Sequence, residues 1–176
     1  MQNFIDTATQ KVYAFNDDVN VIDVGGVYSF TTAADVPLLL PTTLQPYTAP
    51  APTAAQLLAQ AQTTQIATLA QAYGAAIQQP VSYTSKGGIA KTYQADPQSV
   101  SNLQNAILGL QASGATPSGF YWISADNTQV TFAFADLQAL AAAFLAQGWA
   151  SFQKLQTLKA EVLAATSVSA VQAIVW

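Results

Sequence analysis

The first 41 residues alternate apolar and polar positions over short stretches that turn-forming residues separate. Larger apolar side chains recur at about every second position in 11–15, 19–24 and 27–31. Asn16-Asp17-Asp18 and Gly25-Gly26 lie between these stretches. Alternation bounded by Asn, Asp and Gly predicts two hairpin-like units in a small antiparallel sheet. We therefore expect residues 1–45 to form a small β-rich head.

The next segment, residues 46–79, combines a proline-rich linker with a helix. Prolines at positions 41, 46, 50 and 52 favour extended backbone. Thr53 is a candidate cap for a helix over 54–79 that only Gly74 interrupts. Its apolar residues, Leu58, Ile66, Leu69, Tyr73 and Ile77, recur at three-, four- and eight-residue steps. This narrow stripe is compatible with a coiled coil, with a helix in a partner's groove, and with a core helix.

Residues 80–176 alternate strand and helix patterns and predict a third segment. Strands over 81–93 flank a turn at Lys86-Gly87-Gly88, and Asp96-Pro97 begins a helix that runs to about Ser113. A hairpin follows over 120–134, around Asp126-Asn127. Asp136 is the candidate cap of a long helix ending near residue 165, and Thr166 or Ser167 opens a short last helix. Helices on one face of an antiparallel hairpin sheet make the predicted fold class α+β.

Most aromatic residues of this third segment are predicted to lie in its core. Val130, Phe132 and Phe134 are predicted to point inward, in alternation with Gln129 and Thr131, which point outward. The long helix carries its apolar positions at Leu140, Phe144, Phe152, Leu155 and Val162. On the same grounds we interpret the following as core residues in preference to a binding platform: Tyr121, Trp122, Phe132, Phe134, Phe144, Trp149, Phe152 and Trp176.

The composition excludes several classes of function. Only 8% of the residues are charged, the net charge is −4, and the chain has no Arg, His or Cys. Without a basic stripe a nucleic-acid phosphate backbone has no counterpart. Without His or Cys the usual catalytic triads, zinc sites and disulfides are excluded, and we expect no metal and no cofactor. The longest apolar run, 139–146, is too short to span a bilayer, and no signal-peptide pattern follows Met1, so we expect a cytoplasmic protein.

Two weak catalytic patterns remain. Asp17, Asp18 and Asp23 are the nearest carboxylate cluster for glycoside chemistry or calcium binding, but a solvated turn is the favoured interpretation. Ser85-Lys86 is the best candidate for a Ser-Lys dyad, but the two residues lie in a Gly-flanked turn. We therefore expect a non-enzymatic protein that holds a partner.

The C-terminal half contains a series of short motifs in a fixed order. They are the run from Ile89 to Asp96 followed by Ser99 and Leu103, the run from Trp122 to Asn127, Val130-Thr131-Phe132, Asp136-Leu137, Phe152 and Leu158-Lys159. On these motifs, about residues 80–176 resemble an uncharacterised domain of tailed bacteriophages and prophages. In that family the domain typically ends tail-fibre assembly proteins, also described as tail-fibre chaperones. The family's usual acid-Gly hairpin turn is Asp126-Asn127 here. No catalytic residues carry over.

The resemblance implies an accessory protein that assists folding or trimerisation of a receptor-binding tail fibre and either leaves the fibre or stays at its tip. It would act in the host cytoplasm during virion assembly. A permanent structural subunit of the virion tail or fibre is the alternative, and a homo-oligomer is compatible with both. The sequence-based candidates for partner binding are Leu58, Ile66, Leu69, Tyr73, Ile77 and Tyr47.

Overall fold

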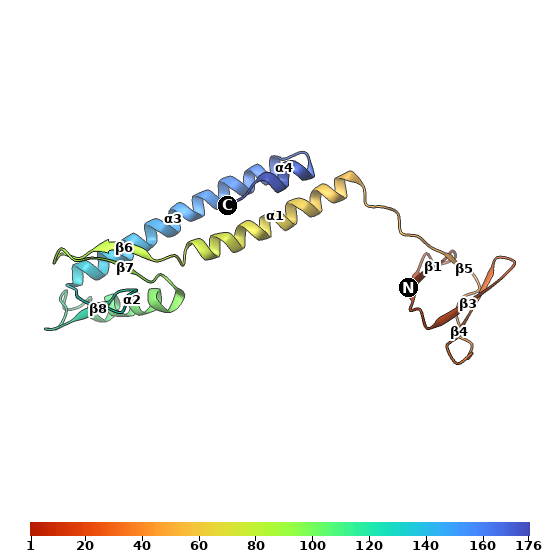
Figure 1. Cartoon of the computed structure of the whole chain (residues 1–176), viewed down its shortest axis with the longest axis horizontal. Helices are drawn as coiled ribbons and strands as arrows, with labels where there is room; N and C mark the ends of the chain where they lie inside the picture. Colours follow the sequence, from red (N-terminus) through yellow and green to blue (C-terminus); the bar gives the residue numbers. More distant parts are fainter. The chain divides into compact units, whose positions relative to one another are not determined.

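The computed structural model describes residues 1–176 and confirms the α+β class (Figure 1). The chain divides into an N-terminal unit, Met1–Pro52, and a C-terminal unit, Thr53–Trp176. None of the helices combines the length and the apolar character needed to cross a membrane.

The N-terminal unit contains only strands: β1 (Gln2–Asp6), β2 (Val12–Phe15), β3 (Val19–Val24), β4 (Val27–Thr32) and β5 (Leu44–Pro46). The three-stranded sheet has the order β2-β1-β5, and β3 and β4 form a separate antiparallel hairpin. Gly25 and Gly26 have φ values of 63° and 87°, so they supply the left-handed turn that a two-residue hairpin connection requires. The predicted β3–β4 hairpin is thus confirmed, whereas β2 pairs with β1 and not with β3.

Aromatic side chains and one buried carboxylate hold the N-terminal unit together. Phe4, Phe30 and Leu44 form its buried core. Asp6, 3% exposed, accepts hydrogen bonds from the Ala8 N–H and from the hydroxyls of Thr9 and Thr43. The Thr43 contact reaches across 37 residues, so this carboxylate ties the β1–β2 turn to the segment before β5.

The C-terminal unit begins with α1 (Ala54–Ala76), which Thr53 and Gln56 close with a reciprocal capping box. The elements that follow are β6 (Val81–Thr84), β7 (Ala90–Tyr93), α2 (Pro97–Leu110), β8 (Tyr121–Ile123), β9 (Gln129–Thr131), α3 (Phe134–Ala164) and α4 (Val168–Ala173). β6 pairs with β7 and β8 with β9, each as an antiparallel hairpin. These elements confirm the predicted order, including the Asp96 cap of α2 and the Ser167 cap of α4.

Helix α1 is part of the C-terminal unit and not a separate arm. It runs antiparallel to α3, because Gln62 near its start contacts the end of α3 while Gln147 of α3 contacts the end of α1. Leu69 of α1 packs in one buried cluster with Leu155, Val162 and Val171. The predicted boundary that grouped this helix with the proline linker is therefore corrected to Pro52–Thr53.

Uncharged glutamine side chains close the helix ends in this unit. The amide of Gln147 donates to the carbonyls of Ala76 and Gln79, at 3.2 and 2.8 Å. That of Gln62 donates to the carbonyls of Val162 and Ala165 at the end of α3. The last carbonyls of a helix have no partner within the helix. Glutamine thus satisfies these carbonyls in a chain that has few charged residues.

A second core lies where both hairpins and α2 meet the first half of α3. Its buried residues are Tyr93, Leu103, Val130, Phe132, Leu137 and Leu140. The predicted inward alternation of Val130 and Phe132 is confirmed, since their exposures are 0% and 1%. Phe134, predicted in the same series, is the first residue of α3 and packs against this core.

Candidate functional site

The predicted partner-binding stripe of α1 is covered by the chain itself. Leu69 is 1% exposed, and Leu58, Ile66 and Tyr73 pack around it against α3 and α4. Ile77 is the half-buried C-cap of the helix. The prediction that this stripe is free to bind a partner is therefore wrong for the folded chain, because α3 and α4 already cover these residues.

Tyr47, the remaining predicted residue, belongs to the other unit. It is half-buried, and its N–H donates to the Asn3 carbonyl at 2.8 Å, which extends the pairing of β5 with β1. The structure thus does not gather the six predicted residues into one site.

The early aspartates form no shared carboxylate site. Asp17 contacts the N-terminal ammonium of Met1, and Asp23 accepts from the Gly26 N–H at 2.8 Å within the β3–β4 turn. The chain contains no group of three or more carboxylates placed to hold a metal ion. Ser85, 3% exposed, accepts from the Ile89 N–H in the β6–β7 turn, which gives this residue a structural partner.

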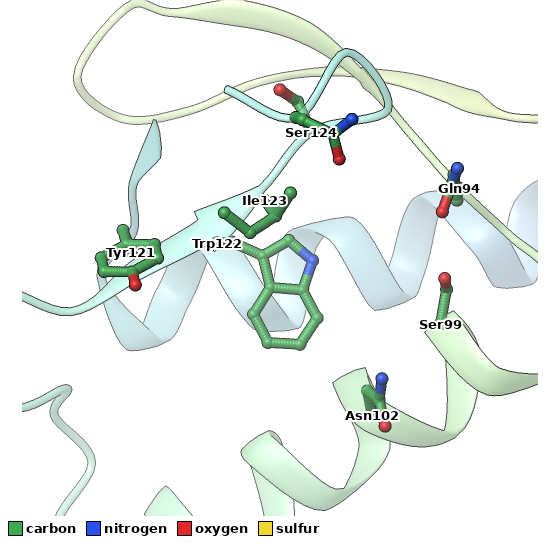
Figure 2. A pocket seen from close by; sticks show the side chains of 8 residues that line it. Gln94, Ser99, Asn102, Tyr121, Trp122, Ile123 and Ser124 are labelled. Atoms are coloured by element: carbon green, nitrogen blue, oxygen red, sulfur yellow. The ribbon is translucent and has the colours of Figure 1, made fainter. Parts of the chain in front are cut away.

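A pocket of about 300 Å³ opens between strand β8 and helix α2 (Figure 2). The indole of Trp122 lies between the strand and the helix, and Ser99 and Asn102 face it from α2. The residues that line the pocket are Gln94, Ser99, Asn102, Tyr121, Trp122, Ile123, Ser124 and Asn127. None of them is charged. This lining suits a neutral polar group.

The two serine hydroxyls of this pocket already make hydrogen bonds within the chain. Ser99 donates to Asp96 at the start of α2, and Ser124 donates to Asp126 in the β8–β9 turn. Lys91 of β7 bonds Asp126 at 2.6 Å. The Lys91 and Ser124 contacts hold the pKa of Asp126 well below its usual value. The pocket wall is therefore joined to the neighbouring hairpin by this partly exposed ion pair and by the backbone bond from the Ala125 N–H to the Thr92 carbonyl, at 2.8 Å.

The most buried charge of the C-terminal unit is Asp136, at 1% exposure. Burial raises its pKa, but the Lys86 N–H, the Ala133 N–H and the Tyr83 hydroxyl donate to it at 2.7, 2.8 and 2.9 Å, and the net pKa is lowered. Burial and the bond to Asp136 raise the pKa of Tyr83 to about 12. Asp136 was predicted as the cap of α3. The cap residue is Ala133, and Asp136 in the first turn accepts its N–H.

An uncovered apolar face of the N-terminal unit lies on the β3–β4 hairpin. Val21 and Phe30 point into the core, whereas Ile22, Val24 and Val27 are 50%, 70% and 54% exposed. Val24 lies opposite Val27 in the register, so all three share the outer face of the hairpin. β3 pairs only with β4, which leaves its other edge without a strand partner.

Sequence reasoning missed this outer face. The alternation in 19–24 predicted one buried face, but both sets of alternating positions contain apolar residues, Val19 and Val21 in one and Ile22 and Val24 in the other. The available signal was that neither face of β3 is consistently polar. In a half-solvated antiparallel hairpin one face is normally polar.

Comparison with known proteins matches the chain to a family. No curated protein and no solved structure matches the chain significantly. Residues 60–175 match the family described as Domain of unknown function (DUF4376). That range covers most of the C-terminal unit and none of the N-terminal one. The chain belongs to the DUF4376 family.

Proposed function

We propose that this protein is a phage tail-fibre assembly protein, a chaperone that binds the receptor-binding tail fibre and assists its folding or trimerisation. The sequence resemblance of residues 80–176 supplies the class of partner. The observation that carries a binding role is the uncovered outer face of the β3–β4 hairpin, formed by Ile22, Val24 and Val27.

The β3–β4 hairpin has two features of a protein-binding element. Its outer face offers contiguous apolar surface, which in soluble proteins marks interaction sites. Its six-residue strand β3 has a free edge that contains one charged residue, Asp23. Proteins normally protect a free strand edge with charged residues or cover it with another element. An extended segment of a partner can pair with an edge that is left free. Of the segments that the sequence suggested for partner binding, namely the N-terminal sheet, the linker and the helix over 53–79, this proposal therefore retains the N-terminal strands.

A division of labour between the two units fits this proposal. The family match lies within the C-terminal unit, and this proposal assigns recognition of the fibre to the N-terminal unit. In this proposal the chain acts through contacts, and the uncharged lining of the β8–α2 pocket is compatible with that role. The protein would act in the host cytoplasm while virions assemble.

Co-expression with the tail fibre encoded beside it tests the proposal. We expect the soluble trimeric fibre to increase over expression of the fibre alone, and the two proteins to co-purify. Unchanged fibre yield without co-purification would contradict the proposal. Mass spectrometry of purified particles then distinguishes a transient chaperone, absent from the virion, from a permanent tail or fibre subunit.

A further inference from the structure

Helix α3 has a second apolar stripe that no part of the C-terminal unit covers. Leu145 and Leu163 are 73% and 65% exposed, and Trp149 and Phe152 are 57% and 40% exposed. The two aromatic rings stack on each other with centroids 5.8 Å apart. At 100° per residue these four positions fall within an arc of roughly 60°. We call them the outer α3 stripe.

The outer stripe is separate from the face that packs against α1 and α2. Phe152 lies about 120° around the helix from the buried Leu140. The expectation that Phe152 and Trp149 belong to the core is therefore wrong, because the inward face is already filled by Leu137, Leu140, Leu155 and Val162.

We propose that the outer α3 stripe pairs with the same stripe of a second copy, and that the two α3 helices run antiparallel. The spacing carries this proposal. Residues 145, 149, 152, 156, 159 and 163 follow one another at steps of four and three residues that read the same in both directions. Such steps are those of a coiled-coil seam. A palindromic series keeps its register when the second helix is reversed.

The reversed register matches the side chains as well as the spacing. Setting Leu145 opposite the second copy's Leu163 sets Trp149 opposite Lys159 and Phe152 opposite Gln156. The lysine stem covers apolar surface and its ammonium can lie over the indole. A parallel pair would instead place Lys159 against Lys159, which like-charge repulsion opposes.

The area is sufficient for association. At these exposures two leucines and two aromatic residues present roughly 500 Å², since a whole aromatic side chain buries about 150–250 Å². Two copies would then bury about 1,000 Å², which is the size at which a specific interface begins. The neighbouring positions Ala142, Ala146, Gln153 and Ala160 are uncharged, and their alanines allow close approach. Lys159 is the one charged residue of the series itself.

Light scattering coupled to size exclusion, together with sedimentation equilibrium, tests association of the full chain. We expect a species of twice the 18.5 kDa chain mass. Trp149→Gln combined with Phe152→Gln should raise the dimer dissociation constant at least tenfold without loss of helical circular dichroism. Leu108→Gln is the matched control, because Leu108 is 67% exposed on α2 outside the stripe. A wild-type monomer at all concentrations, or equal dissociation constants in both variants, would overturn the proposal.

The absence of natural cysteines allows a direct test of orientation. Leu145→Cys with Leu163→Cys should give disulfide-linked dimers on mild oxidation, whereas Leu145→Cys alone should not. Efficient cross-linking of the Leu145→Cys variant alone would show parallel helices and overturn the antiparallel register. This self-association does not depend on fibre binding, so the two proposals succeed or fail separately.

Discussion

Two tyrosines in the same core make opposite use of their hydroxyl groups. Tyr83 donates to the buried Asp136 at 2.9 Å, whereas the buried hydroxyl of Tyr93 makes no hydrogen bond with the protein. The rings lie 6.3 Å apart and share one apolar environment. The two tyrosines therefore form a matched pair. Removing the Tyr83 hydroxyl tests the hydrogen bond to Asp136, and removing the Tyr93 hydroxyl tests the cost of burying an unpaired hydroxyl.

We expect Tyr83→Phe to reduce the free energy of unfolding by about 1.5–3 kcal/mol, the usual contribution of a hydrogen bond to a charged group. Tyr93→Phe should leave it unchanged or raise it, because an unpaired buried hydroxyl is unfavourable. Urea unfolding of both variants measures the difference. Equal loss of stability would contradict the assigned Asp136 network.

Four hydrogen-bonded carboxylates, Asp136 among them, predict that the stability of the protein falls in acid. The folded-state pKa values of Asp6, Asp96, Asp126 and Asp136 all lie below the ordinary value of 3.8. A depressed folded-state pKa stabilises the protein above 3.8, and this contribution is lost as the pH falls through the folded-state pKa. The urea midpoint should therefore be constant above about pH 5 and fall on further acidification.

Asp136→Asn isolates the contribution of one carboxylate to this acid sensitivity. The variant should be less stable at neutral pH, and its midpoint should depend less steeply on pH in the acid range. Asp18→Asn, in an exposed turn, is the control. An Asp136→Asn slope identical to that of the wild type would show that Asp136 does not contribute to the acid transition.

At the scale of the elements, substitutions in helix α1 test whether it is a docking arm or a core helix. Leu69→Ala should destabilise the C-terminal unit by about 2–5 kcal/mol, because it leaves a cavity against Leu155, Val162 and Val171. Ala67→Gly on the exposed face should cost only about 1 kcal/mol, through helix propensity. Thermal unfolding measures both. A Leu69→Ala variant as stable as the wild type would mean that α1 does not pack as described.

The elements were largely predictable because their ends contain local signals. Thr53, Asp96 and Ser167 cap their helices as the sequence indicates, and Asn127 adopts the φ of 61° that its hairpin turn requires. These signals act over three or four residues, so they are visible without tertiary contacts.

The packing faces were less predictable. A narrow apolar stripe on a helix can pack in a core or against a partner. Only the tertiary structure shows that α3 and α4 cover the apolar stripe of α1. The β8–α2 pocket was equally hidden, because Gln94 and Trp122 become neighbours through folding. The wrong assignment of Phe152 has the same origin, since α3 has two apolar faces and spacing alone does not say which is buried.

At the scale of the whole molecule, two units carry two different apolar surfaces. The N-terminal unit presents the outer face of the β3–β4 hairpin, and the C-terminal unit presents the outer α3 stripe. We assign the first to the fibre and the second to a second copy. If both hold, each dimer presents two hairpins, and avidity would strengthen its hold on a fibre with repeated sites.

The dissociation constant of the complex between the full chain and the purified fibre, compared with that of an Ile22→Thr, Val24→Thr variant, tests the central claim most directly. Threonine keeps the β-branched shape that suits a strand while removing apolar surface. We predict a dissociation constant at least about tenfold higher for the variant, a loss of about 1.4 kcal/mol. Val12→Thr, on an exposed position of β2, should bind as the wild type does. Equal affinity of the hairpin variant and the wild type would contradict the account.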